Sequence, residues 1–183
     1  YDRAKKITLF KNTDGKYFTF DEYVKHIEKT QTDKDKNLVY LYANNKEDQH
    51  TYINSANERG YDVLDMDGVI DNHLINALEQ KFENSFFKRV DADTVDKLIA
   101  KEDSIPSKLS EDEQNKIKPV FENQVDKTSY TVIFENLSES DLPVLIMQPE
   151  FMRRMKDMSA LGGGMSYMGN MPDQYNLVVN ANH

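Results

Sequence analysis

The chain has 183 residues, of which 38% are hydrophobic and 30% are charged, and this balance predicts a soluble globular protein of one large domain or two small ones. Its formal net charge of −9 at pH 7 argues against nonspecific binding to nucleic acid or to an anionic membrane. The absence of cysteine excludes disulfides, thiolate metal ligands and cysteine nucleophiles. No apolar run approaches the roughly 20 residues that span a bilayer, and no secretory signal opens the sequence.

The first half of the chain predicts alternating strands and helices. Thr19, followed three residues later by Glu22, has the pattern of a helix N-cap and predicts a short helix. Apolar and β-branched runs predict strands at 38–43, 61–64 and 86–90, and helical periodicity predicts helices at 46–59 and about 70–82. Gly60 is expected to end the first of these two helices. The β-α-β-α-β order predicts a small three-stranded parallel sheet with right-handed crossovers, which is an α/β arrangement.

The second half predicts a separate α+β domain. Residues 100–109 are charged and contain Ser-Ile-Pro-Ser, so a domain boundary is expected there, with 1–103 as one domain and 104–183 as the other. Ser110 with Glu113 predicts a capped helix to about residue 123, in which Pro119 is expected to cause a kink or an early end. Strands predicted at 128–136, 143–147 and 175–180 would form a short three-stranded sheet.

Residues 149–172 form a methionine-rich segment that holds six of the eight methionines of the chain. Its first part predicts an amphipathic helix with one apolar half, made of Phe151, Met152, Met155, Met158 and Leu161. These side chains either fill a core or form an exposed, adaptable surface for partners, because methionine is flexible and polarisable. The same spacing is compatible with copper(I), which favours thioether ligands, but no histidine lies nearby.

One motif indicates an enzyme. Asp65 and Asp67 follow a predicted strand in the sequence DMDGV, which is similar to the first motif of haloacid-dehalogenase-type phosphatases. In those enzymes the first aspartate attacks phosphorus and the second acts as acid and base beside Mg²⁺. The strand is the second of its unit rather than the first, and little sheet follows it to carry the remaining metal ligands. The alternative interpretation is a strand-to-helix turn whose aspartates favour the helix N-terminus.

The order of several short sequence words resembles the heat-shock protein 90 chaperones of the bacterial HtpG type. The matching words lie at residues 20–24 (FDEYV), 38–42 (LVYLY), 60–64 (GYDVL), 67–71 (DGVID), 85–91 (SFFKRVD), 142–147 (LPVLIM), 152–161 and 176–183 (NLVVNANH). Each word is weak by itself, but the ordered set spans nearly the whole chain. In the last word, Ala181 replaces a proline of the family pattern.

This resemblance implies a fragment of a cytoplasmic, ATP-dependent chaperone: the distal part of the middle domain, then a C-terminal domain without its final dimerisation helices. ATP and Mg²⁺ would bind to an N-terminal domain outside the chain, so the fragment itself would have no cofactor and no ATPase activity. Partly folded polypeptides would be its partners, and the whole protein would form a homodimer.

The resemblance also implies two client-binding regions. They are assigned to His73, Leu74 and Asn76 in the first domain, and to Phe151, Met152, Met155, Met158, Leu161, Met165 and Met168 in the methionine-rich segment. His73 stands where the bacterial pattern often has tryptophan. The sequence thus favours a client-binding chaperone fragment, with the phosphatase and a plain structural scaffold as alternatives.

Overall fold

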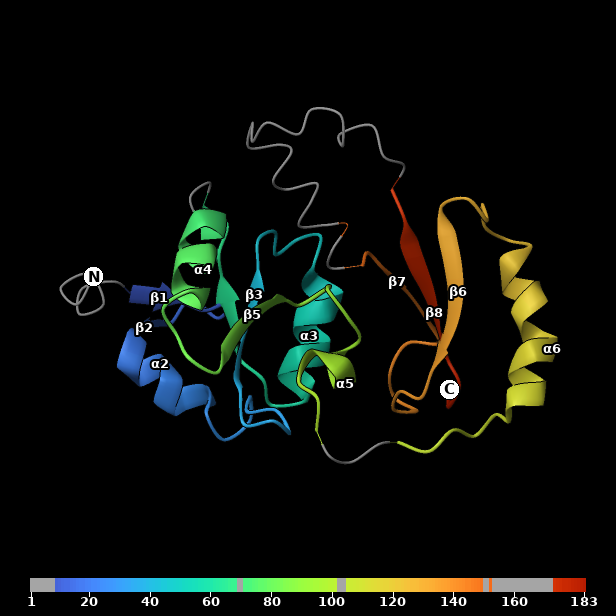
Figure 1. The fold of residues 1–183 in the computed structure, drawn as a ribbon, viewed down its shortest axis with the longest axis horizontal. Helices are drawn as coiled ribbons and strands as arrows, with labels where there is room; N and C mark the ends of the chain where they lie inside the picture. Colours follow the sequence, from blue (N-terminus) through green and yellow to red (C-terminus); the bar gives the residue numbers. More distant parts are fainter. Residues whose placement is uncertain (1–8, 69–70, 102–104, 150–151, 153–172) are drawn as a thin grey trace. The chain divides into compact units, whose positions relative to one another are not determined.

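The structure, a computed structural model, describes residues 9–68, 71–101, 105–149, 152 and 173–183. The chain falls into two compact units. The first contains Tyr1–Asp91 and Val95–Glu102, and the second contains Ala92–Thr94 and Asp103–His183. Each unit has its own three-stranded sheet, which agrees with the predicted α/β and α+β composition (Figure 1).

The sheet of the first unit is parallel, as predicted. Strand β3 (Leu38–Ala43) lies in the centre, between β4 (Val63–Asp65) and β5 (Ser85–Arg89). Parallel neighbours need crossover connections, and helices α3 (His50–Glu58) and α4 (Asp71–Glu79) provide them. The predicted βαβαβ unit is therefore confirmed.

Both faces of β3 are covered, because its side chains alternate between two layers of helices. Tyr40 and Tyr42 belong to a cluster that includes residues of α2 (Phe20–Ile27) and α4. Val39, Leu41 and Ala43, on the opposite face, are also buried. Figure 1 shows α2 and α4 on one side of the sheet, and α3 with the short α5 (Val95–Leu98) on the other.

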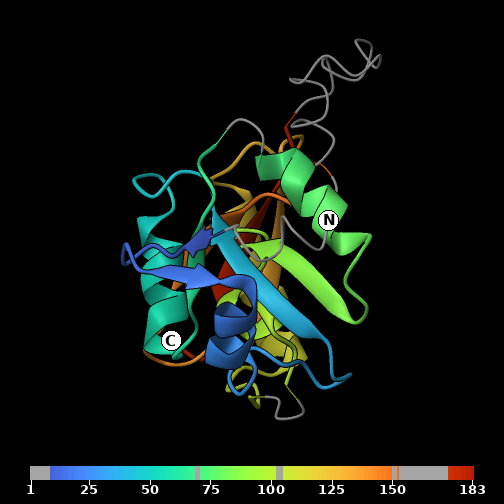
Figure 2. The ribbon, with the colours of Figure 1, turned by 90° about the vertical axis from the view of Figure 1, so that its left-hand side faces the viewer.

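A hairpin that the sequence did not specify precedes this sheet. Strands β1 (Leu9–Lys11) and β2 (Tyr17–Thr19) pair antiparallel, and Gly15 supplies the positive φ of 82° that their turn requires. The turn docks beside β4, where Asn12 pairs with Leu64 and the Thr13 N–H donates to the Val63 carbonyl at 2.8 Å. Figure 2 faces this hairpin. The outer edge of β4 is therefore partly covered.

Helix α3 begins four residues later than predicted, because side chains hold the preceding segment in a turn. The Asn45 side-chain oxygen accepts the N–H groups of Glu47 and Asp48, and Gln49 accepts those of Asn44 and Asn45. At its other end the helix stops at Gly60, as predicted. The bonds Gly60 N–H to Asn57 carbonyl and Tyr61 N–H to Ala56 carbonyl form a Schellman motif.

The second unit has a mixed sheet of order β6-β8-β7. Strand β8 (Tyr175–Asn180) lies in the centre, parallel to β6 (Tyr130–Glu135) and antiparallel to β7 (Val144–Met147). Val132, Leu177 and Val179 form its buried cluster, against which Phe121 and Val125 pack from α6 (Glu111–Glu122) and the loop after it. The three predicted strands are present, but the sequence did not predict their order in the sheet, which the structure supplies.

Helix α6 begins at the predicted cap. The Ser110 hydroxyl accepts from the Glu113 N–H, and the Glu113 carboxylate accepts from the Ser110 N–H at 2.9 Å. The helix continues through Pro119 to Glu122, which confirms the predicted end near residue 123, and Pro119 does not shorten it. No residue of α6 is fully buried, which leaves Pro119 in a lightly packed helix.

Candidate functional site

Helix α4 carries the described residues of the first predicted client-binding region. Its start is set by Asp71, whose carboxylate accepts the Gly68 N–H at 2.8 Å. A Cβ on Gly68 would lie only 2.9 Å from that carboxylate oxygen, so a larger residue there would require the Asp71 side chain to shift. The sequence interpretation of a strand-to-helix turn capped by aspartate therefore holds here.

The three predicted residues of α4 differ in exposure. Ile75 and Leu78 form the buried face of the helix, and Leu74 is half-buried against the same cluster. His73 and Asn76 are exposed, and they are neighbours on the helix surface because they are three residues apart. The structure thus places His73 and Asn76 on an accessible face, whereas Leu74 contributes mainly to packing.

The second predicted region is only partly described. Met152 is helical and half-buried. Phe151, Met155, Met158, Leu161, Met165 and Met168 lie outside the described residues. The interpretation of the methionine-rich segment as a client surface therefore stays a prediction.

Asp65, the predicted phosphatase nucleophile, ends β4 and is held by two lysines. Lys11 from β1 and Lys46 from the loop after β3 both donate to its Oδ2 atom at 2.9 Å. The carboxylate side chain is only 1% exposed, whereas the two lysine side chains are 39% and 43% exposed. Burial alone would raise the pKa of Asp65, but the two lysine contacts outweigh it and lower that pKa. Asp65 is thus a stable anion with a structural role in joining three segments.

The phosphatase arrangement finds no support in this geometry. Asp67 is exposed, and within the described ranges no three His, Asp or Glu side chains gather so that they could hold a metal ion. Asp65 has two oxygens that could attack phosphorus. Its Oδ2 accepts hydrogen bonds from two ammonium groups. Its Oδ1 is buried and has no hydrogen-bond partner among the described residues. Nucleophilic attack would require both a metal-bound substrate and an accessible oxygen.

A second carboxylate, Asp62, connects the hairpin, α2 and β4. It accepts from Asn12 Nδ2 at 2.8 Å and from the Tyr23 hydroxyl at 3.0 Å, and its Oδ2 lies 3.0 Å from His26 Nε2. Burial, together with Asp62, raises the pKa of the Tyr23 hydroxyl well above its ordinary value, so Tyr23 stays a donor. Neither carboxylate network was predicted, because their members are widely separated in sequence.

Several large apolar side chains remain exposed on the described surface. They are Leu9, Tyr17, Phe86, Ile105, Val120, Leu142 and Ile146. Single exposed apolar residues are ordinary, but Leu9 and Tyr17 share one face of the same hairpin. Within the described parts of the chain, no helix has both the length and the apolar character needed to cross a membrane.

The chain has an α/β unit followed by an α+β unit, and this fold by itself does not define a function. Comparison with known sequences identifies its family. The family model described as Hsp90 protein matches residues 2–183. The chain therefore belongs to the heat-shock protein 90 family.

Similar curated proteins agree with this assignment. A protein of Bacteroides fragilis named chaperone protein htpG is 50% identical over 186 residues, which cover all of this chain and 27% of that protein. Chaperone protein HtpG of Bacteroides thetaiotaomicron is 48% identical, and that of Porphyromonas gingivalis is 45% identical, with the same coverage. The chain thus spans about a quarter of the length of these relatives.

Proposed function

We propose that the chain is part of a molecular chaperone and supplies surfaces that bind partly folded polypeptides. The observation that carries this proposal is the family match over residues 2–183, together with relatives that are named chaperones. The exposed face of α4 supports it. His73 and Asn76 lie on the surface and outside the buried cluster of the first unit, so they are accessible to a partner.

Within this proposal, residues 1–103 form the distal part of a middle domain and residues 104–183 form part of a C-terminal domain. The two compact units, each with its own sheet, support this division. We further propose that nucleotide and Mg²⁺ bind to a part of the whole protein outside these residues, and that the whole protein is a cytoplasmic homodimer that couples ATP to client binding.

His73 and Asn76 are the described residues that we propose contact a client, with Leu74 supporting them from below. Met152 and the apolar positions of the methionine-rich segment form the second proposed contact. A flexible thioether side chain adapts to different partners, and burial of one methionine side chain contributes roughly 1.5–3 kcal/mol. Several such contacts would yield weak, reversible binding after the ordering costs are subtracted.

The proposal is tested by suppression of client aggregation. The chain is mixed with a thermally unfolding protein, and light scattering is compared for the wild type, the double variant His73→Ala/Asn76→Ala, and Asn54→Ala. Asn54 is an exposed residue of α3 outside the proposed surface and serves as the matched control. We expect the double variant to suppress aggregation less than the wild type, and the control to match the wild type. Equal suppression by all three proteins would contradict the role of α4.

A second measurement separates client binding from a scaffold role of the methionines. Met155→Ser and Met158→Ser are expected to weaken the binding of unfolded protein with little loss of stability. A loss of several kcal/mol in unfolding free energy would instead indicate a closed core. Magnesium-dependent hydrolysis of p-nitrophenyl phosphate that disappears in Asp65→Asn would contradict the whole proposal.

A further inference from the structure

We propose that Lys11 and Lys46, here called the lysine pair, bind a side-chain carboxylate of an extended acidic peptide segment, with Leu9 and Tyr17 contacting apolar residues beside it. This inference rests on the proposed function, since the peptide segment would belong to a client. It names a contact surface separate from α4 and from the methionine-rich segment, with its own chemistry.

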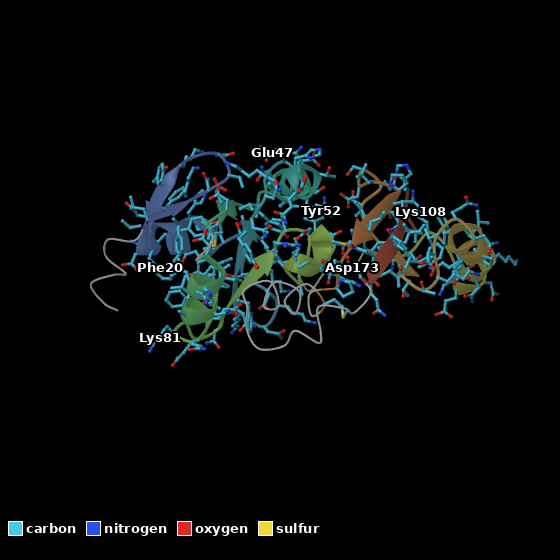
Figure 3. The ribbon with its side chains drawn as sticks, turned by 90° about the horizontal axis from the view of Figure 1, so that it is seen from above. Phe20, Glu47, Tyr52, Lys81, Lys108 and Asp173 are labelled. Carbon is cyan, nitrogen blue, oxygen red and sulfur yellow. The ribbon has the colours of Figure 1, made fainter. Side chains whose placement is uncertain are left out.

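The lysine pair is assembled by the fold. Lys11 lies in β1 and Lys46 lies in the loop after β3, next to Glu47, which Figure 3 labels at the rim of the first unit. Both ammonium nitrogens are 2.9 Å from the same oxygen, Asp65 Oδ2, so they cannot be more than about 6 Å apart. This separation allows one carboxylate to accept a hydrogen bond from each lysine.

Each lysine keeps donors for a ligand. An ammonium group has three N–H donors, and the hydrogen bonds to Asp65 use one from each lysine. About two-fifths of each lysine side chain is exposed, while the Asp65 side chain is 1% exposed. The negative partner is therefore buried and the positive groups face solvent. A carboxylate that approaches from outside meets cations first.

Asp65 also prepares the lysine pair for binding. Its hydrogen bond and charge raise the pKa of Lys11, which keeps this ammonium group protonated. Two long side chains held at one anchor point lose less conformational entropy when a ligand binds than two free lysines would.

Two exposed apolar side chains adjoin the lysine pair. Tyr17 stands directly opposite Lys11 in the hairpin register, and Leu9 is two residues before Lys11 on the same strand face. Tyr17 is 64% exposed and Leu9 is 55% exposed. Phe10, which lies between Leu9 and Lys11 in the strand, is buried on the other face. An extended peptide with an acidic residue at one position and an apolar residue two positions away would place both side chains on the face that meets this surface.

The charge distribution favours a peptide over a polyanion. The chain has a net charge of −9, which repels a polyanion such as nucleic acid much more strongly than a peptide segment that carries only a few carboxylates. The exposed Asp67 also lies close enough to act on Lys11 electrostatically. Two cations and two nearby aspartates leave no excess positive charge for a polyphosphate, but each lysine keeps N–H donors that can be directed at a single carboxylate.

The test measures binding of a short fluorescein-labelled peptide in which Glu and Leu take turns at every second position, with Ser between them, compared with a peptide that has Gln in place of Glu. Fluorescence anisotropy is recorded for the wild type, for Lys11→Gln/Lys46→Gln and for Lys16→Gln. Lys16 belongs to the same hairpin turn, is more exposed and pairs only loosely with Asp14 at 3.6 Å, so it is the matched control. We expect the double variant to bind the Glu peptide about fivefold more weakly, and Lys16→Gln to bind as the wild type does.

A variant that is expected to bind more tightly distinguishes a specific effect on binding from a loss of folding. Asp67→Asn removes the exposed competing carboxylate and should tighten binding of the Glu peptide about twofold. Circular dichroism and thermal unfolding verify that each variant is folded. A merely structural role of the lysine pair would not give tighter binding in Asp67→Asn and weaker binding in the double variant.

Three outcomes would overturn the inference: equal binding of the Glu and Gln peptides, equal weakening by Lys16→Gln, or no tightening in Asp67→Asn. Sedimentation that shows self-association of the wild type, lost in the double variant, would assign the surface to a second copy of the chain instead. If aggregation suppression depends on His73 and Asn76 while these peptide results fail, the proposed function stands and only this surface is rejected.

Discussion

Phe86 and Phe87 are adjacent residues of β5 with opposite environments. Phe87 is fully buried, and its ring stacks on that of Tyr40 at a centroid distance of 4.6 Å and an interplanar angle of 11°. Phe86 points to the other face of the strand and is 47% exposed. Strand alternation thus turns one Phe-Phe pair into a core residue and a surface residue.

We expect Phe87→Ala to lower the free energy of unfolding by about 3–5 kcal/mol, because it removes a large buried ring and leaves a cavity. Phe86→Ala should lower it by less than about 1 kcal/mol, because its ring is half in water already. Urea denaturation followed by circular dichroism measures both values. Similar losses for the two variants would show that β5 is not oriented as described.

Asp65 should make stability depend on pH. Its pKa is lower in the folded chain than in the unfolded chain, so the ionised carboxylate stabilises the fold at pH values above the ordinary carboxyl range near 4. This contribution is lost as the pH falls through the lowered pKa of the folded state, because the protonated group no longer binds both lysines.

Asp65→Asn is therefore expected to cost about 1 kcal/mol or more of unfolding free energy at neutral pH. The difference between the wild type and the variant should shrink steadily below about pH 4. Chemical denaturation at a series of pH values measures this difference. A difference that grows on acidification would mean that Asp65 is protonated in the folded state at neutral pH.

At the level of elements, α6 shows how a helix tolerates proline when it is lightly packed. Pro119 cannot donate the hydrogen bond that Asn115 would accept, yet the helix continues for three more residues. The Asn123 N–H still donates to the Pro119 carbonyl at 3.1 Å, which closes the last turn.

Pro119→Ala should stabilise α6, because it restores a backbone donor and replaces the poorest helix former by the best. We expect a gain of about 1 kcal/mol in unfolding free energy and more helical signal in far-ultraviolet circular dichroism, after allowance for the larger entropy of the unfolded alanine chain. The exposed neighbour Val120→Ala should change stability by only about 0.5 kcal/mol. A loss of stability in Pro119→Ala would mean that proline fixes a bend that the second unit needs.

At the level of the whole molecule, a hydrophobic cluster in the first unit and one in the second, both within the described residues, differ in character. The cluster of the first unit is rich in aromatic rings contributed by the hairpin, α2, β3 and β5. The cluster of the second unit centres on three aliphatic residues, Val132, Leu177 and Val179. Each unit therefore has a core of its own on which its sheet depends.

Hydrogen exchange followed by mass spectrometry tests this division. Phe87→Ala should speed exchange in β3, β4 and β5 far more than in β6 and β8, because only the first cluster loses a member. An equal rise in exchange in both sheets would show that the two units unfold as one cooperative body.

Local sequence patterns predicted much of the fold and part of the candidate site. The caps at Ser110 and Asp71 and the stop at Gly60 follow from side chains and backbone angles within a few residues of each other. The exposure of Asn76 and the burial of Ile75 and Leu78 follow from helical periodicity. The same periodicity predicts Leu74 on the inner face of the helix, and it is half-buried there against the cluster of the first unit.

The sequence by itself determined the family, the alternation of strands and helices, and the helix ends at Ser110 and Gly60, because all of these depend on neighbouring residues or on ordered words. Only the tertiary structure decided that Lys11, Lys46 and Asp65 meet, and that β8 lies between β6 and β7. Lys11 and Asp65 are 54 residues apart, and no local pattern encodes a contact at that separation. The path of the chain through the fold brings them together, so each of them favours the charged form of the other, which raises the pKa of Lys11 and lowers the pKa of Asp65.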